Sequence, residues 1–238
     1  MSILDDQRAY YEARAGEYDE WWYRQGRYTM DPDEEQRWFA DVASAERALD
    51  HFAPTGDVLE FACGTGLWTR HLARHARSVL AVDASPAVLD LNRARNLGAH
   101  VRYRQEDIFA WSPPPSAFDV VFFSYWLSHV PEDLFAPFWR KVATALRPGG
   151  RAFLIDSYHN AELPNHVQDR TLNDGREFRI VKHFWQPADL AAAVAPLGWH
   201  LTAELTPNNH IIHATATPTS AKPAPGEPAS GSTAGEAV

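Results

Sequence analysis

From residue 57 onward, short apolar runs alternate with amphipathic stretches of helical period, and this alternation predicts the fold. The runs that predict strands lie at 57–62, 78–82, 100–104, 118–123 and 150–155. Helical patterns separate most of them, and strand–helix–strand units with right-handed crossovers form a parallel, doubly wound sheet. The remaining predicted elements are a helix at 187–197 and strands at about 199–205 and 210–216. The pattern predicts an α/β protein with a Rossmann-like, seven-stranded, mostly parallel sheet.

Residues 1–52 precede this alternation and have helical patterns rich in aromatic side chains. One amphipathic segment carries Tyr10, Tyr11, Arg14, Ala15 and Tyr18, and an aromatic cluster of Trp21, Trp22, Tyr23 and Tyr28 follows it. A second helix is expected from about Asp33 to His51. Two interpretations stay open: these helices simply pack onto the main domain, or they form a lid over a small-molecule pocket.

The core domain is expected to span residues 53–217, and its regularity is interrupted by an insertion at 157–185. Within the insertion we expect a loop at 157–169 and a hairpin at 170–184, because Asn173-Asp174-Gly175 separates two apolar runs and Asp-Gly favours a tight turn. Residues 218–238 are mostly Pro, Ala, Gly, Ser and Thr, so this tail is expected to be disordered.

Composition and charge exclude several classes of protein. The 238 residues carry a net charge of −9, the wrong sign for a nucleic-acid-binding protein. The one cysteine, Cys63, fits a reducing compartment. No apolar stretch approaches the roughly 20 residues of a membrane span, and the N-terminus lacks the zones of a signal peptide. We expect a cytoplasmic monomer or homodimer whose partner is a small molecule, with no nucleic acid, membrane or metal.

The stretch from Val58 to Thr69 has the pattern strand, small-residue turn, helix, which builds a cofactor cradle at the carboxyl edge of a sheet. Its glycines allow the backbone to approach a ligand closely. The pattern is Ala62-x-Gly64-x-Gly66-x-x-Thr69, so the third glycine of a dinucleotide site is absent. Glu60 just before the turn is a poor neighbour for a pyrophosphate. It favours a cofactor with an ammonium group and a positive sulfur.

Acidic residues follow the next two predicted strands. Asp83 lies at the tip of the second strand, where a carboxylate can accept both hydroxyl protons of a ribose. The alternative for Asp83 is a helix cap, although Ser85 fits that role better. Gln105-Glu106-Asp107-Ile108 ends the third strand, where an acid or amide can bind an adenine amino group and Ile108 can pack on the ring. A surface turn is the alternative there.

This combination resembles the class I S-adenosylmethionine-dependent methyltransferases across roughly residues 40–216. The matching stretches are Val58–Trp68, Val82–Val88, Gln105–Ile108, Phe118–His129 and Leu146–Asp156. The resemblance implies that Glu60 and Gly64 hold the methionine end of the cofactor, Asp83 the ribose, and Asp107 with Ile108 the adenine. The full set of candidate cofactor-binding residues is Tyr11, Arg14, Tyr18, Glu60, Ala62, Gly64, Gly66, Trp68, Asp83, Ala84, Ser85, Glu106, Asp107, Ile108 and Ser124.

The exit of the fourth predicted strand, up to His129, lines the site of methyl transfer in this family. His129 is the candidate catalytic residue, because an imidazole with a pKa near ~6.5 suits a general base at neutral pH. Its alternatives are to orient the acceptor, to cap the following helix or to pack without a role in catalysis.

Three further motifs resemble a bacterial subgroup that includes the phosphonate O-methyltransferase of the dehydrophos pathway. They begin at Tyr10, at Trp126 and at Arg170. This resemblance implies a lid made by the N-terminal helices and the hairpin, and an acidic acceptor. The candidate substrate-binding residues are Tyr23, Tyr28, Trp126, His129, Arg170, Arg179 and Lys182. Two interpretations of these cations stay open: they neutralise an acidic acceptor, or they are solvated charges at the edge of the hairpin. Strand alternation places Arg179 and Lys182 on opposite faces of the hairpin.

The first functional hypothesis is therefore O-methylation of an acidic or hydroxyl-bearing small molecule in specialised metabolism, with S-adenosylmethionine as cofactor. The alternatives are a small-molecule N-methyltransferase, whose amine acceptor the acidic, aromatic N-terminal stretch would hold, and a non-catalytic binding module on the same fold. A nicotinamide oxidoreductase is disfavoured by Thr69 in place of the third glycine.

Overall fold

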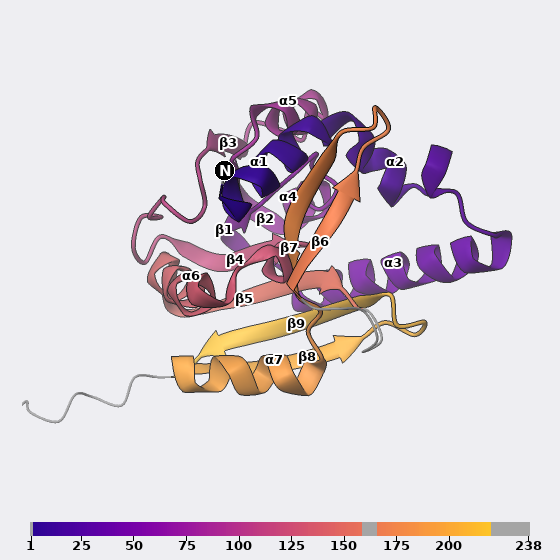
Figure 1. Cartoon of the computed structure of the whole chain (residues 1–238). Coiled ribbons are helices and arrows are strands. Elements are labelled where there is room, and N and C mark those ends of the chain that lie inside the picture. The colour runs from indigo at the N-terminus through magenta and orange to yellow at the C-terminus, as the bar shows by residue number, and fades with distance from the viewer. Residues whose placement is uncertain (1, 159–165, 220–238) are drawn as a thin grey trace, which may run out of the picture.

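A seven-stranded sheet forms the centre of the protein in a computed structural model that describes residues 2–158 and 166–219 (Figure 1). The strand order is β3-β2-β1-β4-β5-β9-β8; the first five strands in this order are parallel, and β9 is antiparallel to both of its neighbours. The strands are β1 (Gly56–Phe61), β2 (Ala76–Asp83), β3 (Val101–Gln105), β4 (Phe118–Ser124), β5 (Leu146–Ser157), β8 (Trp199–Leu205) and β9 (Ile211–Pro218). The predicted fold class is confirmed.

Helices cover both faces of the sheet, because the buried parallel strands carry apolar side chains on alternate sides. On β4, Val121 and Phe123 belong to the same buried cluster as α6 and α7, whereas Val120 and Phe122 belong to that of α3, α4 and α5. The helices are α1 (Ile3–Ala13), α2 (Tyr18–Trp22), α3 (Pro32–Phe52), α4 (Thr69–His75), α5 (Pro86–Ala94), α6 (Glu132–Ala145) and α7 (Pro187–Val194). Short 3-10 turns are η1 (Ala15–Glu17), η2 (Gly26–Tyr28), η3 (Leu127–His129) and η4 (Ala195–Leu197).

The N-terminal helix and a separate hairpin lie together at the edge where the parallel strands end (Figure 1). The hairpin pairs β6 (His166–Thr171) with β7 (Glu177–Lys182), so the predicted hairpin forms, with β6 starting inside the predicted loop. A small apolar cluster of Tyr10, Leu172 and Ile180 joins it to α1. Residues 159–165 of the predicted loop and 220–238 of the predicted tail lie outside the described residues. The domain boundaries stay predictions.

The loop between β1 and α4 requires glycine at position 66 for a packing reason. Gly66 has φ +90°, and a Cβ there would lie 2.3 Å from Oδ1 of Asn92 on α5. Asn92 is fully buried, and its amide donates hydrogen bonds to the Gly64 carbonyl and the Thr69 hydroxyl. Gly66 therefore lets α5 pack directly on the cradle loop, whereas a Cβ at Gly64 would meet no atom within 4 Å.

Gly66→Ala is expected to lower the free energy of unfolding by about 2–4 kcal/mol, because it combines a left-handed backbone with a clash against a buried amide. Gly149→Ala is the matched control, since Gly149 has φ +79° and open space around it. The control should cost about 1–2 kcal/mol. Urea denaturation measures both, and equal losses would contradict the packing role of Gly66.

Candidate active site

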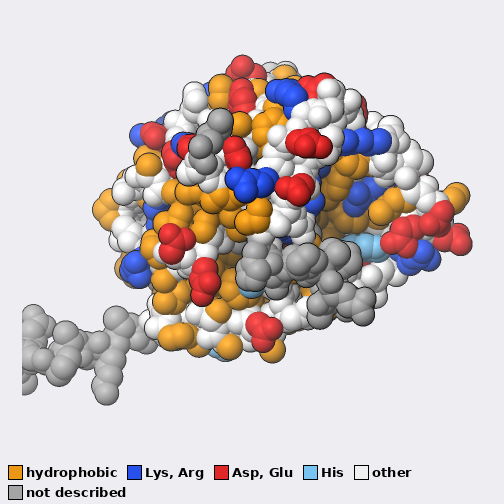
Figure 2. All heavy atoms as spheres, viewed as in Figure 1, with side chains coloured by type: hydrophobic (Ala, Val, Ile, Leu, Met, Phe, Trp, Pro, Cys, Tyr) orange, Lys and Arg blue, Asp and Glu red, His pale blue; other side chains and the backbone are white. Residues whose placement is uncertain are grey.

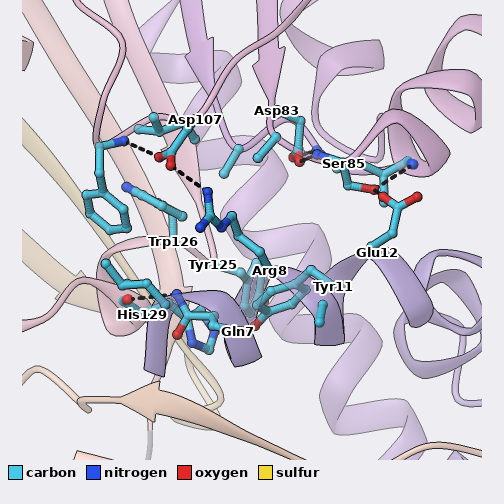
Figure 3. A pocket seen from close by; sticks show the side chains of 18 of the residues that line it. Gln7, Arg8, Tyr11, Glu12, Asp83, Ser85, Asp107, Tyr125, Trp126 and His129 are labelled. Atoms are coloured by element: carbon cyan, nitrogen blue, oxygen red, sulfur yellow. Dashed lines mark hydrogen bonds and ion pairs between the residues drawn. The ribbon is translucent and has the colours of Figure 1, made fainter. Parts of the chain in front are cut away.

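A cavity of about 480 Å³ opens beneath α1 at the carboxyl ends of β1, β2, β3 and β4 (Figure 3). Ten of the predicted cofactor-binding residues line it: Tyr11, Tyr18, Ala62, Gly64, Asp83, Ala84, Ser85, Asp107, Ile108 and Ser124. The residues that the structure places together thus come from five separate stretches of the chain. The predicted substrate residues Trp126 and His129 line the same cavity.

Five predicted cofactor-binding residues do not line this cavity, each for a structural reason. Trp68 is buried against Trp22 in the core, and Glu106 forms an ion pair with Arg104 at the surface. Gly66 packs against α5, Glu60 is buried and bound to the Thr69 hydroxyl, and Arg14 lines a second cavity.

The carboxylate of Asp83 holds the turn on which a ligand would rest. Its two oxygens accept hydrogen bonds from the backbone N–H groups of Gly64 and Ser85, both at 3.0 Å. Burial raises the pKa of Asp83, and these hydrogen bonds oppose the rise. The cap of α5 is the Ser85 hydroxyl, which accepts from Val88 N at 3.2 Å. The helix-cap alternative for Asp83 is therefore wrong, and its role toward a ribose stays a prediction.

Two polar contacts hold α1 over the cavity. Arg8 Nη1 lies 2.8 Å from Asp107 Oδ2, and the Ser85 hydroxyl donates to the Glu12 carboxylate (Figure 3). The sequence analysis missed Gln7, Arg8 and Glu12 as lining residues. The helical spacing could have predicted that Arg8 and Glu12 line the cavity, because positions 4, 8, 11 and 12 share one face of a helix and Tyr11 was already a candidate cofactor-binding residue.

Glu60 is buried and its Oε2 accepts a hydrogen bond from the Thr69 hydroxyl at 2.7 Å, while its Oε1 has no partner in the part of the chain that the structure describes. Burial raises the pKa of Glu60 to about 8, the hydrogen bond from Thr69 opposes the rise, and the nearby Asp83 adds to it. Glu60 is therefore protonated at neutral pH in the free protein. Its predicted role at the methionine end of the cofactor stays a prediction.

His129 joins three elements through its ring and its backbone. Its Nδ1 lies 2.7 Å from the Val181 carbonyl on β7, which can only accept, so Nδ1 carries the proton. Its Nε2 lies 2.7 Å from the hydroxyl of Tyr11 on α1. Burial lowers the pKa of His129 well below its ordinary value, and the charge of Lys182 adds to this. The imidazole stays neutral, and its one free lone pair accepts from Tyr11.

A second cavity, of about 540 Å³, adjoins the first and shares Tyr11, Tyr18, Tyr125 and His129 with it. In Figure 2 the surface is hollowed between the hairpin and the start of α3, and blue side chains lie inside the hollow. The described lining contains five cations and no carboxylate; the cations are Arg14, Arg24, Arg27, Arg170 and Lys182.

Three of the predicted substrate residues line this second cavity besides His129: Tyr28, Arg170 and Lys182. Arg179 points away, with a 61% exposed side chain 3.8 Å from Asp6. Tyr23 lies outside both cavities and accepts from Arg70. Lys182 is buried, and its Nζ donates to the hydroxyls of Ser128 at 2.9 Å and Ser157 at 2.5 Å.

Two residues with strained backbone conformations lie where the parallel strands of the sheet end. Ala62 after β1 and Tyr125 after β4 both have positive φ, +52° and +49°. Such conformations in residues other than glycine cost about 1–3 kcal/mol and cluster at functional sites. Among the described residues no helix is long and apolar enough to cross a membrane, and none of their His, Cys, Asp and Glu side chains form a group of three that suits a metal ion.

The sheet order, the cradle and the adjoining cavities are those of a methyltransferase, and a family model described as a methyltransferase domain matches residues 58–150. The chain belongs to the S-adenosylmethionine-dependent methyltransferases, and S-adenosylmethionine is the cofactor of this family of enzymes. The resemblance inferred from the motifs is confirmed.

Among solved structures the chain is similar to DhpI. The complex of DhpI with SAH is 36% identical, covers 92% of this chain and 100% of DhpI, and has a TM-score of 0.76. The complex of DhpI with SAM and HEP is also 36% identical, covers 91% and 98%, and has a TM-score of 0.77. A ubiquinone biosynthesis O-methyltransferase of Xylella fastidiosa is 34% identical over 155 residues, 60% of this chain and 61% of that relative. The chain thus spans about three fifths of that relative's length.

The pH dependence of stability tests the state of Glu60. Glu60 ionises at about pH 8 in the folded protein, against an ordinary value of 4.5. The folded state therefore holds an extra proton between these values, and the free energy of unfolding falls as the pH rises through them. Glu60→Gln stays neutral, so relative to the original protein it should gain up to about 4 kcal/mol between about pH 5 and about pH 9.

Urea denaturation at the two pH values measures this difference, and Glu106→Gln at a surface ion pair is the control with little expected change. The same loss of stability with pH in Glu60→Gln and in the original protein would contradict a buried, protonated Glu60.

Proposed function

We propose that this protein transfers the methyl group of S-adenosylmethionine to an oxygen of an acidic small molecule held in the second cavity. The observation that carries this proposal is the charge of that cavity, which has five cations and no carboxylate in its described lining. An acid such as a phosphonate or a carboxylate is the ligand that such a lining stabilises. The similarity to DhpI, and the resemblance to a phosphonate O-methyltransferase, support the same acceptor.

In the proposed reaction an ionised acceptor oxygen attacks the methyl carbon, the carbon–sulfur bond breaks, and the products are a methyl ester and S-adenosylhomocysteine. An ionised acid already carries the attacking electron pair, so no general base is needed. His129 then acts as a positioning residue: it is neutral, and it holds the Tyr11 hydroxyl at the wall between the two cavities. Placing donor and acceptor on either side of this wall supplies proximity and orientation.

The positive charge of the second cavity also disfavours an amine acceptor. A substrate ammonium ion would meet the charges of Arg14 and Arg170, which form no ion pair with a described carboxylate, and of Lys182, which has Asp156 3.8 Å from its Nζ. A non-catalytic binding module is disfavoured because the candidate cofactor cavity and the cationic cavity share a wall of four side chains, an arrangement suited to group transfer.

A methyl-transfer screen tests the proposal. The protein is incubated with S-adenosylmethionine and matched sets of phosphonates, carboxylates, phenols and amines, and the release of S-adenosylhomocysteine is measured. We expect turnover with phosphonates or carboxylates and none with amines. Turnover confined to amines or phenols would overturn the proposal.

Two hairpin variants test which cations contact the acceptor. Lys182→Met should raise the KM for an acid acceptor about tenfold or more, because it removes a charge-assisted contact. The dissociation constant of S-adenosylhomocysteine should stay within about twofold. Arg179→Met, on the same strand but exposed, is the matched control and should leave KM unchanged. Equal effects of the two variants would contradict a site built on the buried face of the hairpin.

The pH dependence of KM gives an independent measurement. Burial lowers the pKa of Lys182 to about 8; the neighbouring Asp156 opposes this, and the charges of Arg170 and Arg14 add to it. Lys182 therefore loses its charge as the pH rises above about 8, and KM for an acid acceptor should rise there. The rise should be absent in Lys182→Met, and its persistence in that variant would assign it to another group.

A further inference from the structure

Two of the five cations in the second cavity, Arg14 and Arg24, have guanidinium groups with neither an ion pair nor a hydrogen bond among the residues that the structure describes. Their residues are 9% and 8% exposed, and the Nε of each guanidinium is buried without a hydrogen-bond partner. Neither forms an ion pair with a described carboxylate. In contrast, Arg27 donates to the Tyr28 hydroxyl and the Thr171 carbonyl, and Arg170 donates to Gln168.

Aromatic rings cover the faces of these two guanidinium groups and leave their N–H edges unused. Arg24 lies 3.6 Å from the centre of the Trp38 ring and 5.0 Å from that of Trp21, and Arg14 lies 5.1 Å from the centre of the Tyr18 ring. A cation–π contact contributes about 0.5–2 kcal/mol, whereas a buried charge without a partner costs several kcal/mol. Stacking therefore offsets part of the cost and presents the planar edge that binds an acid in a bidentate way.

The backbone at Arg24 supports a functional placement. Its φ is +54°, a left-handed conformation that costs a residue other than glycine about 1–3 kcal/mol. Burial lowers the pKa of Arg24 to about 10, so the group stays charged at neutral pH. The strain directs a charged side chain into a cavity that lacks an opposing carboxylate.

Electrostatic interactions connect these cations with one another and with His129. The charges of Arg170 and Arg14 both act on Lys182 and on His129, beside the wall that the two cavities share. The charge of Arg14 acts on Arg24, and both guanidinium groups lie within 5.4 Å of the centre of the Trp21 ring. Arg14 and Arg24 therefore form a pair around Trp21, and Arg14 also stacks on Tyr18 of the shared wall.

We infer that Arg14 and Arg24 form a second anion subsite, and that the acceptor is a molecule with two acidic groups. One group lies between Lys182 and Arg170 and receives the methyl; the other lies between Arg14 and Arg24 beside Trp21. A cavity of about 540 Å³ is larger than a single small acid requires. This inference rests on the proposed function and adds the chemical class of the acceptor.

A homologous series of ligands tests the subsite. Phosphonocarboxylates with one to four methylene groups between their acids are compared with alkylphosphonates of the same chain length. Calorimetry in the presence of S-adenosylhomocysteine gives the affinity, and S-adenosylhomocysteine release gives KM in a separate assay with S-adenosylmethionine. At the best spacing, the second acid should improve both by about tenfold or more, the size expected for hydrogen bonds to charged groups.

Arg24→Met should abolish this preference, because it should lower the affinity for the phosphonocarboxylate about tenfold more than the affinity for the alkylphosphonate. The matched control is Arg151→Met, since Arg151 also stacks on an aromatic ring, 4.0 Å from the centre of Phe52, but lines neither cavity. Arg14→Met should act as Arg24→Met does, which keeps the test valid if one variant fails to fold.

The outcomes separate the inference from the proposed function. Methyl transfer to both ligand types with equal KM in the unaltered protein would overturn the second subsite and leave the proposed function in place. An equal loss of affinity for both ligand types in Arg24→Met would also overturn the subsite. Binding of and methyl transfer to neither ligand type would overturn both proposals.

Discussion

Three hydrogen bonds at His129 and one between Val181 and Gln7 determine how the two cavities are built. The buried amide of Gln7 donates to the His129 carbonyl and accepts from Val181 N, both at 3.1 Å. The His129 ring contacts the Val181 carbonyl and the Tyr11 hydroxyl, each at 2.7 Å. These bonds join α1, the hairpin and the exit of β4 at one point. They place α1 over the first cavity and the buried face of β7 at the second cavity.

The two cavities differ in charge, and the difference matches the two substrates of the proposed reaction. Asp83, Asp107 and Glu12 line the first cavity, where a donor with an ammonium group and a positive sulfur would lie. Arginine and lysine side chains line the second, where an anion would lie. As the methyl moves, the positive charge of the donor and the negative charge of the acceptor are both neutralised. Opposite linings stabilise each reactant and prevent either from occupying the other's place.

Sequence patterns identified the sheet edge but not the orientation of the elements above it. Asp83 and Asp107 were predictable because they lie at or just beyond the carboxyl ends of neighbouring predicted strands, and parallel strands end at one edge. Alternation placed Arg179 and Lys182 on opposite faces of the hairpin, but contacts with Gln7 and Tyr10 decide which face is buried. Arg14 was expected at the cofactor because helical period alone does not show which cavity a helix borders, and Arg24 was missed because it follows α2 in a left-handed conformation that no helical pattern shows. Trp68 and Gly66 fit the cradle motif but serve packing.

A crystal structure of the protein with S-adenosylhomocysteine and an alkylphosphonate tests the central claim most directly. The account predicts S-adenosylhomocysteine beneath α1 at the ends of β1 and β4, and the phosphonate in the adjoining cavity, within hydrogen-bond distance of Lys182 or Arg170. The phosphonate oxygen should face the sulfur across the wall formed by Tyr11 and His129. A phosphonate bound at Arg179, or absent from the second cavity while S-adenosylhomocysteine is present, would contradict the account.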